Sequence, residues 1–277
     1  MKPAFQKDDA LLADIAAARE RNASRLWWLG QSGFLLIAGG KTVLFDPYLS
    51  DSLTQKYAHT DKPHVRVTER VIAPDRLTGI DIITTSHSHT DHLDAATLLP
   101  LLSVNPTAQL VAARANRAMI LERLGNVVEH LVETDAGECI SLAGAEFHGI
   151  PAAHNIVERD EHGHCRFLGY VARVGALTVY HSGDTVLHDG LVPALKHFQV
   201  DVALLPINGN QPERRVAGNL DGAEAARLAK EISARVVVPH HFDLFAFNTE
   251  PPDLFESECR RLGQSFRTLR QGEGMDL

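Results

Sequence analysis

The stretch SHSHTDHLD (86–94) crowds nitrogen and oxygen donors directly behind the apolar run DIITT. It holds histidines and aspartates, residue types that bind metal ions. His87 and His89 are two positions apart, so both imidazoles point the same way on an extended chain and can converge on one cation. Asp91 and His92 follow where the chain should turn into a helix, which aims a second pair of donors at a neighbouring point. This spacing predicts two metal ions in one pocket, whereas a polar surface loop would not need the HxHxDH pattern.

A complete site needs further ligands, and three other strand ends can supply them. PAAHN places His154 after a strand, YHSGDT does the same for Asp184, and VVVPHHFD ends a strand at His240 and His241. In each case a buried strand stops and a side chain that can bind a metal follows, so rigid elements could hold the site in shape.

The motif HSHTDH, followed far downstream by single His, Asp and His residues, resembles the metallo-β-lactamase superfamily. Other segments are similar to its ascorbate-6-phosphate-lactonase-like branch, over residues 25–245. The resemblance implies an α/β fold, a four-layered αββα sandwich with a one- or two-metal site at its edge. The segments that carry the similarity to the branch are LWWLGQSGF (26–34), FDPYLS (45–50), YHSGDT (180–185), PINGN (206–210), GNLDGAEAARLA (218–229) and VVVPHHFD (236–243).

The resemblance also implies how the ligands are divided between the metals. One metal would be bound by His87, His89 and His154, the other by Asp91, His92 and His241, with Asp184 as the bridge. The branch carries its last ligand two residues after a proline, so Pro239 favours His241 over His240. Asp91 is also the expected catalytic residue, as a proton acceptor. Nitrogen and oxygen ligands leave zinc, manganese or iron open. Zinc is what the superfamily implies first, and manganese is the alternative for this branch.

Other polar residues are expected around the ligands. Asp46 is predicted to accept a hydrogen bond from a ligating histidine, with a turn-forming role before proline as the alternative. His181 is expected at the rim as a hydrogen-bonding residue. Arginine can bind a phosphate or carboxylate through two parallel contacts, although a solvated charged loop explains the same residues. The candidate substrate contacts are Asn208, Arg214 and Arg215. The segment HGHC (162–165) could suggest a separate zinc site, but its polar surroundings favour a solvated hairpin tip.

Hydrophobic periodicity predicts the elements that position these residues. No Pro/Gly/Ser-rich linker interrupts the chain, so residues 1–277 should form one domain, with 1–24 as an N-terminal helical extension. Residues 51–79 are polar and irregular, and are expected to be a long loop that could serve as a lid. Helices are predicted over 8–22, 93–102, 113–124, 222–232 and 252–262. Strands are predicted over 25–30, 33–38, 41–46, 81–85, 109–113, 139–151, 166–174, 177–182, 200–207 and 235–240.

Composition limits the partners and the compartment. The net charge is −8, which gives no attraction to nucleic acid or to anionic lipid. The chain has three cysteines, an odd number without a CxxC motif, which favours a reducing compartment. No signal-peptide pattern or membrane-spanning run is evident. We therefore expect a cytoplasmic protein with a small-molecule substrate and without nucleic-acid or membrane partners, and a homo-oligomer is left open.

The expected chemistry is hydrolysis. Two divalent cations lower the pKa of a shared water from about 15.7 to about 7, which yields a hydroxide nucleophile. A GxSxG nucleophile motif is absent from the sequence. The first hypothesis is a hydrolase that opens a lactone or similar ester, including one of a phosphorylated sugar acid. The alternatives are a phosphodiesterase on the same fold, a di-iron redox protein, for which more carboxylate ligands would be expected, and a non-catalytic metal-binding protein.

Overall fold

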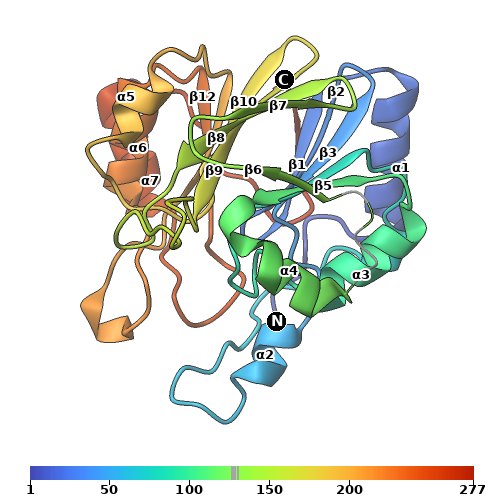
Figure 1. The fold of residues 1–277 in the computed structure, drawn as a ribbon, viewed down its shortest axis with the longest axis horizontal. Coiled ribbons are helices and arrows are strands. Elements are labelled where there is room, and N and C mark those ends of the chain that lie inside the picture. The colour runs from blue at the N-terminus through green and yellow to red at the C-terminus, as the bar shows by residue number, and fades with distance from the viewer. Residues whose placement is uncertain (126–128, 130) are drawn as a thin grey trace.

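The computed structural model describes residues 1–125, 129 and 131–277. Two mixed β-sheets pack face to face, and helices cover the outer face of each sheet (Figure 1). The sheet orders are β13-β1-β2-β3-β4-β5-β6 and β12-β11-β10-β9-β8-β7. The predicted four-layered α/β sandwich is therefore confirmed.

The first sheet begins with two antiparallel hairpin connections and continues in parallel pairs. The aromatic and apolar side chains of β1 and β2 leave little polar surface, so their outer face must be covered. Helix α1 does this with Leu11 and Ile15, which pack in one cluster with Trp27 and Leu35. The strands are β1 (Arg25–Gly30), β2 (Gly33–Ala38), β3 (Lys41–Phe45), β4 (Ile82–Thr85), β5 (Gln109–Ala113), β6 (Leu131–Thr134) and β13 (Gly274–Asp276), and the helices are α1 (Asp8–Glu20), α3 (Ala95–Val104) and α4 (Arg117–Leu124).

The second sheet combines an antiparallel part with three parallel strands. Helix α6 starts at a capping box, in which Asp221 accepts from the Glu224 amide and Glu224 accepts from the Asp221 amide. The elements are β7 (Cys139–Leu142), β8 (Ala145–Pro151), β9 (Leu168–Val174), β10 (Leu177–His181), α5 (Leu191–Leu195), β11 (Val202–Pro206), α6 (Gly222–Glu231), β12 (Val236–His240) and α7 (Asp253–Leu262).

The core between the sheets is built from large side chains of both inner faces. Phe34, Phe45, Phe147 and Tyr170 are fully buried there. Burial of one such side chain stabilises the fold by roughly 2–3 kcal/mol, so this interface holds the two sheets together.

The structure differs from the sequence-based prediction in several short elements. The region 51–79 is not a plain loop, because it contains α2 (Ser52–Lys56) and a 3₁₀ turn (Pro74–Arg76). The predicted strand 139–151 is two strands, β7 and β8, which turn at Ala143 and Gly144. The prediction missed β6, β13 and α5, which are three to five residues long and too short for a clear periodic pattern. No helix in the described part of the chain is both long and apolar enough to span a membrane.

Strand direction places the carboxyl ends of several strands at one edge. β3 and β4 are parallel, and β1 runs in the same direction because two antiparallel steps separate it from β3. By the same argument β8, β10 and β12 share one direction in the second sheet. The residues after these strands can therefore meet at one edge of the sandwich.

Candidate metal centre

The predicted ligands gather at this edge in two groups. Donor atoms of His87, His89 and His154 lie within 4.8 Å of one another, and we call these residues the histidine half. Donor atoms of a second set satisfy the same limit and form the carboxylate half. The members of the carboxylate half are Asp91, His92, Asp184 and His241. The structure thus brings together all seven residues that the sequence analysis proposed as ligands.

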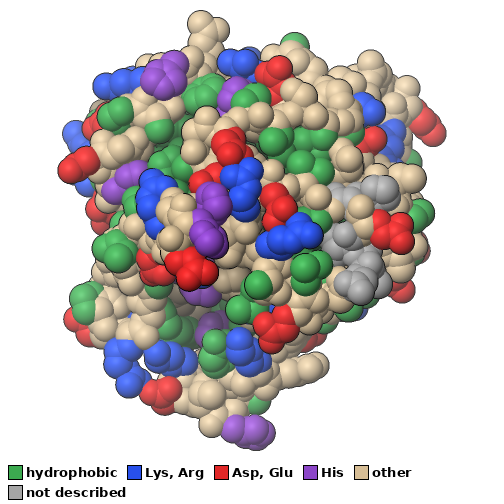
Figure 2. Space-filling model, viewed as in Figure 1, with side chains coloured by type: hydrophobic (Ala, Val, Ile, Leu, Met, Phe, Trp, Pro, Cys, Tyr) green, Lys and Arg blue, Asp and Glu red, His purple; other side chains and the backbone are tan. Residues whose placement is uncertain are grey.

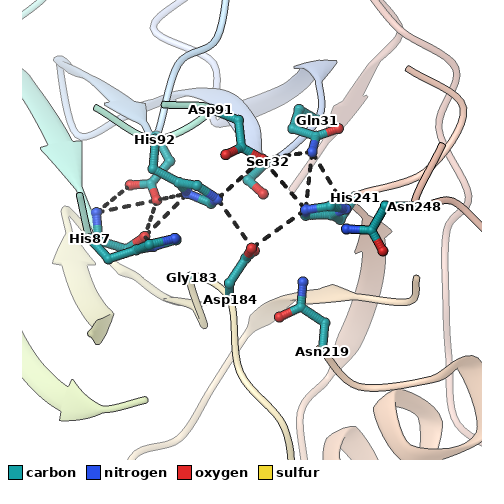
Figure 3. A network of polar contacts seen from close by, with 12 residues as sticks. Gln31, Ser32, His87, Asp91, His92, Gly183, Asp184, Asn219, His241 and Asn248 are labelled. Carbon is teal, nitrogen blue, oxygen red and sulfur yellow. Dashed lines mark hydrogen bonds and ion pairs between the residues drawn. The ribbon is translucent and has the colours of Figure 1, made fainter. Parts of the chain in front are cut away.

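Asp184 lies between the two halves. Its Oδ1 is 3.4 Å from His92 Nε2, and its Oδ2 is 3.4 Å from His241 Nε2. Oδ2 is also 3.8 Å from His154 Nε2, in the histidine half. Figure 3 shows the Asp184 carboxylate between the rings of His92 and His241. This is the placement that a bridging ligand requires.

Neighbouring acceptors orient the histidine rings. His92 Nδ1 donates to Asp46 Oδ2 at 2.7 Å, and His154 Nδ1 donates to the Gly218 carbonyl at 2.7 Å. The Nε2 atoms of both rings are then left to face the site, the usual arrangement for a ligating histidine. In the histidine half, His87 Nδ1 lies 3.0 Å from Ser86 Oγ, so its ring is turned in the same way.

Asp46 is fixed at the end of β3 by its own partners. It accepts from the Thr84 hydroxyl at 2.9 Å and from the Ser86 amide at 3.1 Å, and its side chain is fully buried. Its backbone has a φ of 38°, which non-glycine residues seldom adopt. The geometry agrees with the predicted contact to a ligating histidine. The turn alternative accounts for the backbone but not for the bond to His92.

A cation fits the unpaired atoms of the site. His87 Nε2, His92 Nε2 and Asp184 Oδ1 are buried and make no hydrogen bond among the described residues, although the last two form an ion contact of 3.4 Å with each other. A buried polar atom without a partner typically costs about 1–3 kcal/mol. Because these atoms belong to the two close groups, a divalent cation in each group would satisfy them, and their nitrogen and oxygen chemistry suits such ions.

The histidine half has an apolar backing. The ring of Phe167 lies 5.0, 5.8 and 5.6 Å from those of His87, His89 and His154. Burial, reinforced by the neighbouring imidazoles, lowers the pKa of His87 well below 6.5 and that of His89 to about 4. The imidazoles of His87 and His89 are therefore neutral at pH 7.

The carboxylate half has the opposite electrostatics. Burial alone would lower the pKa of His92 and His241, but Asp184 and Asp91 more than offset it. The pKa of His92 rises well above 6.5, and that of His241 rises to about 9. Burial alone would likewise raise the pKa of Asp91 and Asp184, yet these histidines hold both well below 3.8. Without a metal, two imidazolium groups therefore balance two carboxylates.

The sequence left His240 and His241 as alternatives, and the structure separates them. His241 belongs to the carboxylate half, with a φ of 61° that turns the chain as β12 ends. His240 is the last residue of β12, and its buried ring stacks on His181 at 5.2 Å. The expectation that His181 lies at the rim is wrong. It is fully buried, and its Nε2 donates to the Ser32 carbonyl at 2.8 Å.

Sequence reasoning missed Gln31. Its Nε2 donates to Asp91 Oδ2 at 2.9 Å and lies 3.0 Å from His241 Nε2 (Figure 3). Gln31 follows β1, one of the strands that end at this edge, and its φ of 48° is again unusual for a non-glycine residue. Its position after a strand was the available signal. Gln31 therefore orients the proposed proton acceptor Asp91.

A cavity of about 300 Å³ opens onto the centre. In Figure 2 histidine side chains are visible in a hollow above the segment that carries α2, with Lys or Arg side chains at its edge. Residues 53–64 form one wall, so part of the region proposed as a lid does border the site. The lining residues are Leu53, Lys56, Tyr57, Lys62, His64, Ser88, His89, Thr90, Asp91, Arg123, His154, Asp184, Val216, Ala217, His241 and Asn248.

The three candidate substrate contacts do not line this cavity. Arg214 is held by the side chain of Glu250 and by the Asn208 carbonyl. Arg215 pairs with Asp61. Asn208 is buried, and its amide donates to Asn248 Oδ1 at 3.1 Å. The geometry does not support direct substrate contact by these residues. Asn208 instead positions Asn248, a lining residue that the sequence did not single out.

The HGHC segment forms a turn at the end of a short β-bridge between Arg159 and Cys165. Asp160 accepts from the amides of His162 and His164 at 2.9 Å each. Within the described ranges these histidines join no group of metal-binding donors. This agrees with the solvated hairpin tip that the sequence favoured over a zinc site.

Comparison with known proteins places the chain in a family. Residues 41–242 match the beta-lactamase superfamily domain. The chain is similar to a UPF0173 metal-dependent hydrolase of Caldivirga maquilingensis, with 28% identity over 256 residues that cover 91% of this chain and 97% of that protein. Its structure is similar to that of the metallo hydrolase Igni18 from Ignicoccus hospitalis (TM-score 0.67, 20% identity, 92% of this chain and 98% of that one). It is also similar to an isothiocyanate hydrolase from Delia radicum gut bacteria (TM-score 0.70, 18% identity, 91% and 98%). The structural similarities reflect the shared metallo-β-lactamase fold, and because the family match spans most of the sandwich, the chain belongs to the metallo-β-lactamase superfamily.

Proposed function

We propose that the protein is a metal-dependent hydrolase that opens a lactone or a similar small ester, as in the ascorbate-6-phosphate-lactonase-like branch. The observation that carries this proposal is the pair of donor groups joined through Asp184 at the floor of the cavity. Relatives described as metal-dependent hydrolases support the class of reaction. A cavity of about 300 Å³ suits a small molecule better than a polymer.

Some residues of the site would bind the metals, and others would accept protons or orient the ligands. The histidine half and the carboxylate half would each hold one divalent cation, with Asp184 shared between them. Such cations lower the pKa of a bound water to about 7 and polarise a substrate carbonyl. Asp91, which His92 and His241 keep ionised and Gln31 orients, would accept a proton from the attacking water. Asp46 keeps the His92 ring turned toward the site.

The test combines metal analysis with a substrate panel. Protein purified without added metal is analysed for zinc, manganese and iron, and is then assayed against lactones, carboxylic esters and phosphodiesters. We expect ester or lactone hydrolysis that needs the metal and is lost in the Asp184→Asn variant. Hydrolysis of phosphodiesters alone would replace this proposal with the phosphodiesterase alternative. Tightly bound iron with no hydrolysis of any substrate would favour redox chemistry.

A further inference from the structure

The cavity beside the metal centre is locally cationic on an acidic protein. The chain carries 35 acidic and 27 basic residues, for a net charge of −8. Yet the cavity lining contains Lys56, Lys62 and Arg123, and its acids are only Asp91 and Asp184, which belong to the carboxylate half. Outside the ligand set the charge of the lining is thus wholly positive.

These three cations have no carboxylate partner within 4.0 Å among the described residues. Lys56 Nζ lies 3.3 Å from Thr90 Oγ1, and Lys62 Nζ donates to the Arg215 carbonyl. Arg123 donates through Nη1 to the Ser88 carbonyl at 2.6 Å and to the Leu93 carbonyl at 3.0 Å, so these two contacts leave Nη2 and Nε unused.

The arginines just outside the cavity behave differently. Arg214 pairs with Glu250 and Arg215 pairs with Asp61. Of these five basic residues, only the three in the lining lack a carboxylate partner within 4.0 Å among the described residues. Lys56 is exposed, whereas Lys62 and Arg123 are half-buried. A cleft lined by charges of one sign attracts ions of the opposite sign, so this lining favours an anion.

Hydrogen bonds fix both ends of the segment 53–64, which forms the cavity wall that carries Lys56 and Lys62. Leu53 N donates to the Tyr48 hydroxyl at 2.9 Å, and Thr54 Oγ1 donates to the His64 carbonyl at 2.6 Å. The His64 ring packs at 4.6 Å from Tyr57 and at 5.3 Å from Phe245. The backbone of the wall is thus held in place before a ligand arrives, which reduces the entropy lost on binding.

We propose that Lys56, Lys62 and Arg123 form an anion subsite, so the substrate carries a phosphate or carboxylate group besides the bond that is cleaved. This inference rests on the proposed hydrolase function and narrows its substrate class. A lysine ammonium group acts as a point charge and can bind either a phosphate or a carboxylate. Leu53, Tyr57 and Val216 supply the apolar surface for the rest of the molecule.

The first experiment measures binding without metal. Metal-free protein is titrated by calorimetry with inorganic phosphate and, separately, with acetate. Removing both charges in a Lys56→Gln/Lys62→Gln variant should weaken the tighter of the two probes about tenfold or more, and added salt should weaken it in the wild type. The matched control is Lys196→Gln, an exposed lysine beside Asp201 at the opposite ends of the strands, which should bind as the wild type does. The same affinity in all three proteins would overturn the subsite.

The second experiment separates this inference from the proposed function. The metal-loaded protein is assayed with two lactones of the same ring, one neutral and one bearing a carboxylate or phosphate. We expect the double variant to lower kcat/KM about tenfold or more for the charged lactone only. Equal turnover of both lactones, unchanged in the variant, would refute the subsite and leave the hydrolase standing. Lysine-dependent phosphate binding without hydrolysis of either lactone would support the subsite and refute the hydrolase.

Discussion

Both halves of the centre offer imidazoles, but only the carboxylate half adds carboxylates, and the protonation of the imidazoles differs between the halves. In the histidine half, Phe167 and burial keep His87 and His89 neutral. In the carboxylate half, Asp91 and Asp184 keep protons on His92 and His241. The charge of an imidazole in this site therefore depends on its neighbours in space and not on the sequence motif that carries it.

This difference affects how each half takes up a cation. A cation that enters the histidine half meets the neutral nitrogen atoms of His87 and His89 at pH 7. In the carboxylate half it gains two carboxylates but must displace protons from His92 and His241, so uptake there releases protons and strengthens as the pH rises toward about 9. The two halves should therefore be separable by experiment.

The largest effect should come from Asp184, the residue that contacts both halves. We expect Asp184→Asn to lose metal from both halves and to lower hydrolysis by about a thousandfold or more, since the ions contribute several kcal/mol to the transition state. Metal content by mass spectrometry and kcat/KM measure this. The control is Asp189→Asn, an exposed aspartate in the same loop, which should retain both metals and full activity. Two bound metals in Asp184→Asn would show that the halves are independent.

A smaller and one-sided effect is expected from Asp46. It contacts His92 but not the histidine half, so Asp46→Asn should weaken metal binding about 10- to 100-fold in the carboxylate half alone. Competition with a chelator of known affinity, followed for each of two bound ions, measures this. Equal weakening of both ions would mean that Asp46 supports the whole edge of the sheet, through Ser86, and not one ligand.

Much of the site was predictable because the residues that can bind metal come directly after the ends of strands. A dense motif after β4 and single donors after β8, β10 and β12 are visible in the sequence, and the parallel directions of these strands bring them together. The reason given for His87 and His89 was only partly right, because β4 ends at Thr85 and both histidines lie on a bent loop. The turn at His241 likewise depends on a positive φ, which strand alternation cannot predict.

Residues that act through distant contacts were not predictable. Phe167 resembles any core aromatic residue until the fold sets it against the three histidines, which come from other parts of the chain. Lys56 and Lys62 lie in a polar segment whose composition suggested an irregular loop, while Arg214 and Arg215 looked equally suited to bind an anion. Only the tertiary structure reveals which cations are paired and which line the cavity.

The smallest predicted effect is on the stability of the metal-free protein, and it has opposite signs for the two halves. His89 has a folded pKa of about 4, so the unfolded chain binds a proton that the fold rejects, and stability falls as the pH drops from 6.5 to 4. His241 has a folded pKa of about 9, so the fold holds a proton that the unfolded chain releases, and stability falls as the pH rises from 6.5 to 9. Each shift corresponds to about 3 kcal/mol of unfolding free energy.

Urea denaturation in the presence of a chelator, repeated across this pH range, should therefore give a maximum near pH 6.5. His89→Asn should reduce the slope on the acid side, although the lowered pKa values of the buried His87 and His240 leave part of it in place. His241→Asn should reduce the slope on the alkaline side, while the raised pKa of His92 leaves part of it in place. Saturating metal should remove the alkaline loss in the wild type, because the cation takes the place of the protons on His92 and His241. An alkaline slope that persists in His241→Asn and with metal would place its origin outside the carboxylate half, and the contrast between the two halves would then be lost.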